Sequence, residues 1–315
     1  MSYRRAYEAL HGRFTDRTPW MTFIDKPGYL HRLTGIDPYK DPRGAYVEAA
    51  RRWDVDLLFG GPPEGAPPPV SADTGAGPDP HTRRTEWGVF PSTWIKHASE
   101  FKTPQDILGF LPQEHDLHTV YGDFKAKTTV SDLADLFGHR HRRAQDAMGE
   151  QALVSGGIGT TLFQWFIAVF DWEPFLETAA LYPDRFKDVI ARFVEMSRKL
   201  TEAWARTDIV LFTSHDDLAM TRGPVFHPDW YRDYLFPWYP HIWEPLKKAG
   251  KKIVFVSDGS YGVLADDLAK AGADGFYMEA LVDLETMAHK FPDKVLIGNT
   301  DCRVITLGTP EEVEK

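Results

Sequence analysis

Residues 244–298 read EPLKKAGKKIVFVSDGSYGVLADDLAKAGADGFYMEALVDLETMAHKFPDKVLIG and repeat one local pattern three times. In each copy a short helical segment ends in a turn that contains Gly or Pro-Asp, and a brief apolar strand follows. The strands predicted here are residues 253–257, 275–278 and 295–298. They are apolar along most of their length, as strands buried on both faces of a parallel sheet are. Three successive units of this kind favour a closed α/β barrel over a doubly wound sheet.

The same alternation extends toward the N-terminus. Four more strands are predicted at residues 20–24, 56–59, 153–156 and 209–213. The clearest helix follows Pro183, because its apolar positions fall on one stripe at helical spacing. We therefore predict an α/β fold, a (β/α)8 TIM barrel, as one domain over residues 1–315. The stripe consists of Phe186, Val189, Ile190, Phe193, Val194 and Leu200.

An excursion at about residues 60–150 interrupts the predicted barrel after its second strand, and we expect it to form a lid or a substrate wall. Residues 60–82 are too rich in Pro and Gly for a regular element. Residues 85–101 predict a β-hairpin, and residues 106–151 predict polar helices without an evident strand.

The strand count is seven, whereas a barrel needs eight. The sequence ends in GTPEEVEK, which predicts the start of one more helix with Thr309 as N-cap and Pro310 at its first position. We therefore expect the last strand and helix of the barrel to lie beyond Lys315.

Composition excludes several classes of function. The net charge of −10 argues against sequence-independent nucleic-acid binding, which relies on Lys and Arg at the phosphates. No apolar run approaches the ~20 residues that span a bilayer, so we expect no membrane insertion and a cytoplasmic location. Cys302, the single cysteine, excludes an internal disulfide and an all-thiolate metal site.

Acidic and imidazole groups follow several of the predicted strands. The fourth strand leads to Ser-His-Asp-Asp at 214–217, the fifth to Ser-Asp-Gly-Ser at 257–260, and the sixth to Glu279. The carboxyl ends of barrel strands carry the chemistry, so these groups should share a pocket. Clustered carboxylates suit general acid catalysis or divalent metal binding.

Structural roles are open for the same residues. Asp216 or Asp217 can cap the next turn, and Asp258 can form an Asx-turn with Gly259. Cys302 can be an inert small hydrophobic residue.

Three segments resemble one protein family. They are YEALHGRFTDRTPW at 7–20, DDLAMTRGPVFHPDWYRDYLFPWYPHIWEPLKKAGKKIVFVSDGS at 216–260 and VLIGNTDCRVITLGTPEEV at 295–313. They resemble the uroporphyrinogen decarboxylase superfamily, which contains the haem-pathway decarboxylase and methyltransferases that act with corrinoid proteins. The resemblance implies a TIM barrel with its pocket at the carboxyl ends of the strands.

Departures from the family patterns separate its branches. The decarboxylase carries two arginines for the tetrapyrrole carboxylates after its first strand, where this chain has Ile24 and Gly28, and Asp25 would repel carboxylates. This argues against uroporphyrinogen as the substrate. The corrinoid methyltransferases bind zinc through His-x-Cys after the fifth strand, where this chain has Val256-Ser257-Asp258.

A subset of the superfamily with Ser-Asp-Gly at this point resembles methyltransferases of O- or N-methyl compounds. The resemblance implies that this chain demethylates a small methylated compound and passes the methyl group to a corrinoid protein. Asp258 and Glu279 would be the main catalytic groups, with His215 and Asp217 in support. The expected zinc ligands are Asp258, Glu279 and Cys302, with His215 as an alternative.

Four residues are expected to contact the substrate: Asp25, Gln164, Trp165 and Tyr231. Two other functions remain open on the sequence. One is a decarboxylase or related lyase of a small acid, which would use Asp25 or Asp217 as its acid and no metal. The other is a non-catalytic barrel that binds a corrinoid or another ligand.

Overall fold

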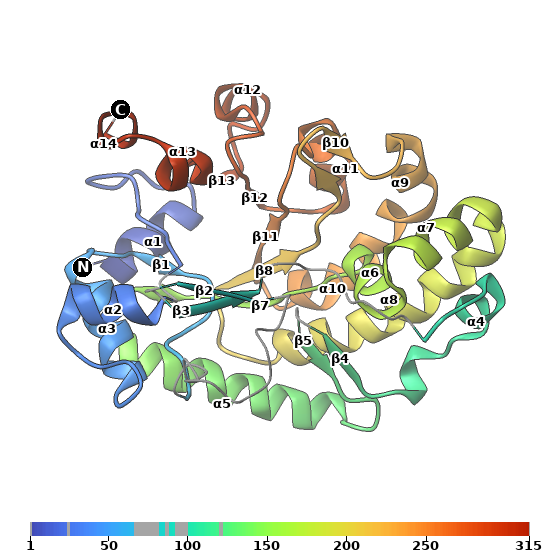
Figure 1. Cartoon of the computed structure of the whole chain (residues 1–315), viewed down its shortest axis with the longest axis horizontal. Helices are drawn as coiled ribbons and strands as arrows, with labels where there is room; N and C mark the ends of the chain where they lie inside the picture. The colour runs from blue at the N-terminus through green and yellow to red at the C-terminus, as the bar shows by residue number, and fades with distance from the viewer. Residues whose placement is uncertain are drawn as a thin grey trace. The chain divides into compact units, whose positions relative to one another are not determined.

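The computed structural model describes residues 2–23, 26–65, 82–85, 88–91, 100–119 and 122–314. The chain divides into two compact units. Unit 1 comprises Met1–Ala98 and Phe137–Gly156, and unit 2 comprises Ser99–Leu136 and Gly157–Lys315. Figure 1 labels most helices and strands of both units.

Unit 2 is built on a five-stranded sheet in which each strand lies beside the next one along the chain. The order is β13-β12-β11-β8-β7, and the pairs from β8 to β13 are parallel. A doubly wound sheet reverses its strand order at a switch point, and this sheet does not. The parallel α/β fold is therefore confirmed, while closure into a barrel stays a prediction. The strands are β7 (Gly156–Ile158), β8 (Leu211–His215), β11 (Lys252–Val256), β12 (Gly275–Tyr277) and β13 (Val295–Ile297).

Helices connect and flank these strands, and the longest one is the helix predicted most clearly. Helix α8 (Pro183–Ala205) buries the whole predicted apolar stripe. Helix α10 (Tyr239–Lys248) packs along it, and Thr201 Oγ1 donates to the carbonyl oxygen of Ile242 at 2.6 Å. The remaining elements between β7 and β13 are α6 (Phe163–Phe170), α7 (Trp172–Leu181), β9 (Ala219–Met220), β10 (Gly223–Pro224), α9 (Pro228–Tyr234), η2 (Phe236–Trp238), η3 (Gly262–Leu264), α11 (Ala265–Ala271) and α12 (Leu284–Lys290).

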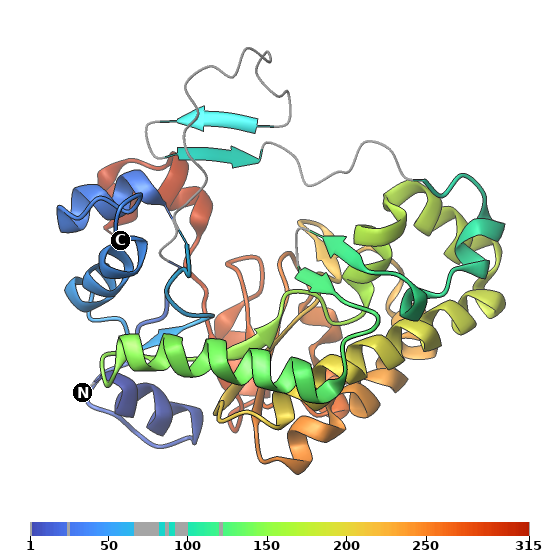
Figure 2. The ribbon, with the colours of Figure 1, turned by 90° about the horizontal axis from the view of Figure 1, so that it is seen from below.

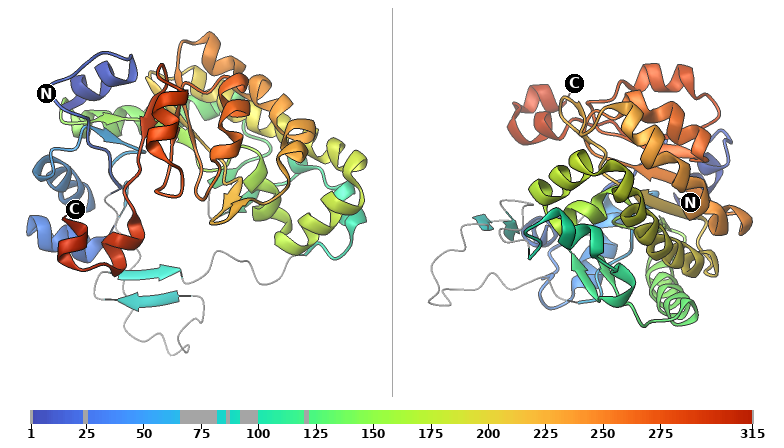
Figure 3. Two further views of the ribbon diagram at one scale, coloured as in Figure 1. Left: turned by 90° about the horizontal axis from the view of Figure 1, so that it is seen from above. Right: turned by 90° about the vertical axis from the view of Figure 1, so that its right-hand side faces the viewer.

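A short hairpin corrects the expectation of strand-free helices at residues 106–151. Strands β4 (Leu117–Thr119) and β5 (Gly122–Phe124) pair antiparallel. The hairpin packs on α8, because Lys199 Nζ lies 5.1 Å from the ring centroid of Phe124 and donates to the carbonyl oxygen of Ala126 at 2.9 Å (Figure 2). Nearby, α4 (Pro104–Gly109) packs against α7 and α8, and η1 (Pro112–Glu114) follows it (Figure 3).

The predicted C-terminal helix start is confirmed. Helix α14 (Pro310–Val313) begins with a capping box in which Thr309 and Glu312 each accept a hydrogen bond from the other's backbone amide. Helix α13 (Cys302–Leu307) precedes it.

Unit 1 holds a second, shorter parallel pairing. Strands β1 (Leu57–Leu58) and β6 (Leu153–Val154) pair, and Met21 forms an isolated bridge to Leu57. Within the described part of the first predicted strand, residues 20–23, the pairing consists of this one bridge. The other elements are α1 (Ser2–Leu10), α2 (Pro27–Thr34), α3 (Pro42–Arg52), β2 (Thr82–Thr85), β3 (Gly88–Pro91) and the second part of α5 (Val130–Met148).

Strands β2 and β3 form a hairpin that overlaps the one predicted at 85–101. Residues 86–87 and 92–99 of that prediction lie outside the described residues. The predicted irregular stretch at residues 60–82 lies mostly outside the described residues. Across the ranges that the structure describes, no helix combines the length and the apolar character needed to cross a membrane.

Candidate functional site

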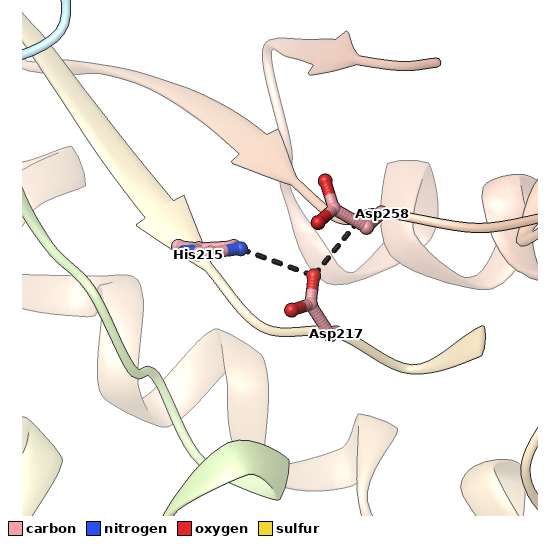
Figure 4. Close-up of side chains that lie close together, drawn as sticks. All are labelled: His215, Asp217 and Asp258. Atoms are coloured by element: carbon pink, nitrogen blue, oxygen red, sulfur yellow. Dashed lines mark hydrogen bonds and ion pairs between the residues drawn. The ribbon is translucent and has the colours of Figure 1, made fainter. Parts of the chain in front are cut away.

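Three side chains of unit 2 gather at the carboxyl ends of two neighbouring strands, as Figure 4 shows. Strand β8 ends at His215, Asp217 follows two residues later, and Asp258 follows β11. The two strand ends meet because Val256 pairs with His215. One nitrogen or oxygen atom from each side chain lies within 4.8 Å of the other two. We call His215, Asp217 and Asp258 the strand-end cluster.

Asp217 is the centre of this cluster. Its Oδ1 accepts a hydrogen bond from the backbone amide of Asp258 at 2.8 Å and lies 3.0 Å from Nε2 of His215. Its Oδ2 accepts from Nε2 of Gln164 at 2.6 Å. Both carboxylate oxygens are thus held, so the side chain has one defined orientation toward His215 and Asp258.

The neighbouring residue, Asp216, has a structural role, but it caps an earlier helix and not the next turn that the sequence suggested. Its carboxylate is fully buried and accepts hydrogen bonds from the first backbone amides of α6, those of Leu162, Phe163 and Gln164, at 2.8–2.9 Å. The hydroxyl of Tyr239 donates to the same carboxylate at 2.7 Å. Asp216 therefore caps α6 and fixes its start beside the end of β8.

Glu279 lies next to the cluster and binds Gly259, the residue that follows Asp258. The amide of Gly259 donates to Oε2 of Glu279 at 3.0 Å. Gly259 has a φ of 75°, and a Cβ atom there would lie 2.5 Å from the carbonyl oxygen of Ala219. The backbone thus requires glycine at position 259, because any side chain there would collide with the carbonyl oxygen of Ala219.

Burial and charge shift the protonation of the cluster. Loss of solvent around Asp258 and the negative charges of Asp217 and Glu279 raise the pKa of Asp258 to about 6, although this residue keeps an exposed face. Burial opposes the charged form of His215, but the hydrogen bond and charge of Asp217, with the charge of Asp258, outweigh it and raise the pKa of His215. The site therefore holds exchangeable protons near neutral pH.

Tyr277 is a buried neighbour of the acidic groups that the sequence interpretation did not name. Burial first, and then the charges of Asp258 and Glu279, raise the pKa of the Tyr277 phenol to about 12. Tyr277 and Glu279 are two residues apart at the end of β12, and residues at this spacing share one face of a strand. That period-two spacing is the signal that could have found it.

Two of the expected substrate contacts are buried side chains. Tyr231 is fully buried, and its hydroxyl donates to the carbonyl oxygen of Leu218 at 2.6 Å. This bond holds the turn after Asp217, and the complete burial of the side chain leaves the ring no open face. Trp165 is 2% exposed. Its Nε1, like Oε1 of Gln164, is buried without a hydrogen-bond partner among the described residues.

The remaining expected site residues are placed differently. Gln164 contacts Asp217 directly, as given above. Cys302 is the exposed first residue of α13 and is not a member of the strand-end cluster. Asp25 lies outside the described residues. The cluster contains Asp258 and His215, which were expected as a zinc ligand and as an alternative ligand, together with Asp217. Glu279 lies beside it through the amide of Gly259.

The strand-end cluster fits a divalent cation by its donor chemistry. One imidazole and two carboxylates are ligands that zinc accepts, with metal–ligand distances of about 2.0–2.2 Å. A tetrahedral site of that size separates its ligand atoms by about 3.4 Å. In the cluster, Nε2 of His215 and Oδ1 of Asp217 are 3.0 Å apart, and the three donor atoms lie within 4.8 Å of one another. Oε1 of Gln164 is buried without a hydrogen-bond partner among the described residues, while the amide nitrogen of the same side chain donates to Asp217.

Parallel strands, helical connections and a polar site at the strand ends define an α/β protein whose candidate site lies at the carboxyl ends of its strands. The sequence model of one family, described as uroporphyrinogen decarboxylase (URO-D), matches residues 141–315, more than half of the chain. The chain belongs to this family.

Solved structures agree on the fold. A methyltransferase from Methanosarcina mazei superposes with a TM-score of 0.55 and 14% sequence identity, over 95% of this chain and 82% of that one. At this identity the likeness concerns the fold alone. No curated protein sequence matches the chain.

Proposed function

We propose that the chain is a methyltransferase that demethylates a small O- or N-methyl compound and passes the methyl group to a corrinoid protein. The observation that carries the proposal is the strand-end cluster, whose donors suit a divalent cation. The family and the methyltransferase with a similar fold support the choice of reaction class. The substrate class and the corrinoid partner rest on the family resemblance.

His215, Asp217 and Asp258 would hold the cation, with Glu279 beside them. When bound, the cation supplies Lewis acidity toward the oxygen or nitrogen atom that leaves the methyl group. Gln164 keeps Oδ2 of Asp217 turned away from the site and so presents Oδ1 to it. Without the cation, Asp258, whose pKa is raised to about 6, is able to hold a proton at the same place.

Metal analysis of the purified full chain tests the cation part of the proposal. We expect one zinc ion per chain by mass spectrometry after metal reconstitution. Asp258→Asn should weaken zinc binding at least ~10-fold, since it removes the charge that the cation requires. Asp229→Asn is the matched control, because Asp229 is an exposed residue of α9. Equal zinc binding by wild type and Asp258→Asn would contradict the proposal.

A methyl-transfer assay tests the reaction itself. Free cob(I)alamin stands in for the corrinoid partner, and its change in absorbance on methylation reports transfer from a panel of methyl ethers and methylamines. We expect methylation and a demethylated product with the zinc-loaded protein. Release of carbon dioxide from a small acid by metal-free protein would favour the decarboxylase or lyase reading instead.

A further inference from the structure

The hydrogen-bond ladder between β8 and β11 is interrupted just beyond the two strand ends. The amide of Asp216 still donates to the carbonyl oxygen of Val256 at 2.9 Å. Bonds in a parallel ladder are evenly spaced, so a continued ladder would join the same groups two residues further along each strand. These groups are the amide of Leu218 and the carbonyl oxygen of Asp258.

The hydroxyl of Ser257 lies between these two groups. Its Oγ accepts a hydrogen bond from the amide of Leu218 at 3.3 Å and donates one to the carbonyl oxygen of Asp258 at 3.0 Å. A hydroxyl can accept and donate at the same time, so the two bonds are compatible. Two bonds in series span more than the ~2.9 Å of one direct N–H···O bond. The hydroxyl therefore keeps the two chain segments apart at Asp258.

A second hydroxyl binds the carbonyl oxygen of Leu218. A continued ladder would join this oxygen to the amide of Ser260, but it accepts from the hydroxyl of Tyr231 at 2.6 Å. The amide of Ser260 donates to the carbonyl oxygen of Met220 at 3.0 Å. Ser257, Leu218 and Tyr231 are fully buried, so water does not compete for these bonds. Two buried hydroxyls thus hold the interruption of the ladder.

The interruption makes the amide of Asp258 available to the strand-end cluster. In a continued ladder this amide would donate to the carbonyl oxygen of Asp216. In the structure it donates to Oδ1 of Asp217 at 2.8 Å. That hydrogen bond holds the carboxylate of Asp217 toward His215 and Asp258. The geometry of the cluster therefore requires a ladder that stays open at this point.

We propose that Ser257 is a positioning residue of the strand-end cluster. Its hydroxyl keeps the ladder open beyond β8 and β11 and so leaves the amide of Asp258 to Asp217. Ser257 acts through backbone groups and does not bind the cation itself. Its effect on cation binding rests on the proposed function, because a cation held by Asp217 and Asp258 needs both carboxylates in fixed positions.

Crystal structures of the metal-free wild type and of Ser257→Ala test the spacing without any cation. Alanine removes the hydroxyl, so the buried amide of Leu218 needs another acceptor. We expect it to donate directly to the carbonyl oxygen of Asp258 in the variant, at about 2.9 Å. The carboxylate of Asp217 should then lose the amide of Asp258. A variant that keeps the wild-type separation and the bond from the Asp258 amide to Asp217 would overturn the proposal.

Cation binding tests the effect on the site. Ser257→Ala should bind zinc at least ~10-fold more weakly than the wild type, since partners that orient a metal ligand contribute about 10- to 100-fold to affinity. Isothermal titration calorimetry measures the difference. Cobalt(II) in place of zinc adds a spectroscopic readout, because its visible absorption reports the coordination geometry. The spectrum should differ between wild type and variant, which a general loss of stability would not cause.

Ser260→Ala is the matched control, because Ser260 lies in the same turn and the variant keeps the backbone amide that binds Met220. It should bind both ions within about twofold of the wild type. Equal zinc affinity and equal cobalt spectra in Ser257→Ala and the wild type would also overturn the proposal. If the wild type binds neither ion, the cation part of the proposed function is wrong, and the two crystal structures alone decide the role of Ser257.

Discussion

Asp216 and Asp217 are adjacent in the chain, yet their carboxylates bind different partners and have different roles. Asp216 is fully buried and accepts the first amides of α6, whereas Asp217 faces His215 and the amide of Asp258. Gln164 connects the two, since its amide binds Asp216 and its side chain binds Asp217. One residue of α6 is therefore held by both acids.

Asp216→Ala should destabilise the protein by about 3 kcal/mol, since it leaves several buried donors without an acceptor. Chemical denaturation followed by circular dichroism measures the change. Asp283→Ala is the control, because Asp283 caps α12 at an exposed position, and its loss should be clearly smaller. Equal losses of unfolding free energy in the two variants would contradict the prediction that the buried cap contributes more to stability than the exposed one.

Gln164→Leu should weaken zinc binding ~10-fold while leaving the fold intact. The variant removes the hydrogen bond to Oδ2 of Asp217, and partners that orient a metal ligand typically contribute 10- to 100-fold to affinity. Isothermal titration with zinc measures it. Gln113→Leu, which removes an exposed glutamine that donates to the carbonyl oxygen of Arg192, should bind zinc like the wild type.

Zinc affinity should fall as the pH drops through about 6. Protons compete with the cation for Asp258, whose pKa is about 6, and for His215, whose pKa is raised, so both groups act in the same direction. Competition with a chromophoric chelator between about pH 5 and about pH 7.5 measures the slope. Asp258→Asn should show a shallower slope, and an unchanged slope would assign the proton to other groups.

Gly259→Ala should destabilise the protein by about 2 kcal/mol and lower zinc affinity as well. Alanine is strained at a φ of 75°, and its Cβ would collide with the carbonyl oxygen of Ala219. Gly262→Ala is the control, because its φ lies outside the left-handed region and its Cβ would come no closer than 3.5 Å to Val282. That control should stay within about 0.5 kcal/mol of the wild type.

The sequence predicted the parallel strands and α8 well, because continuous apolar runs and a six-residue stripe leave few alternatives. It did not predict the β4–β5 hairpin. Residues Leu117–Thr119 and Gly122–Phe124 are three-residue strands that mix Leu, His, Gly and Asp. Such short strands carry no periodic signal, and their packing on α8 forms only in the folded chain.

Candidate site residues could be predicted wherever the end of a strand could be predicted. His215, Asp217, Asp258 and Glu279 follow strands, and the structure brings them to one edge of the sheet. The burial of Tyr231 was not predictable. It lies in a run of aromatic residues, and sequence does not show which ring is buried under its neighbours.

The sequential order of the strands in the sheet of unit 2 has a consequence for synthesis of the chain. Gln164, Asp217, Asp258 and Glu279 come from four successive strand–helix units, and translation supplies them in that order. When β8 has left the ribosome and β11 has not, the nascent chain contains His215 and Asp217 but lacks the amide of Asp258 that binds Asp217. Cation binding should therefore begin only after β11 has joined β8 on the ribosome, and ion loading would then report that this part of the sheet is complete.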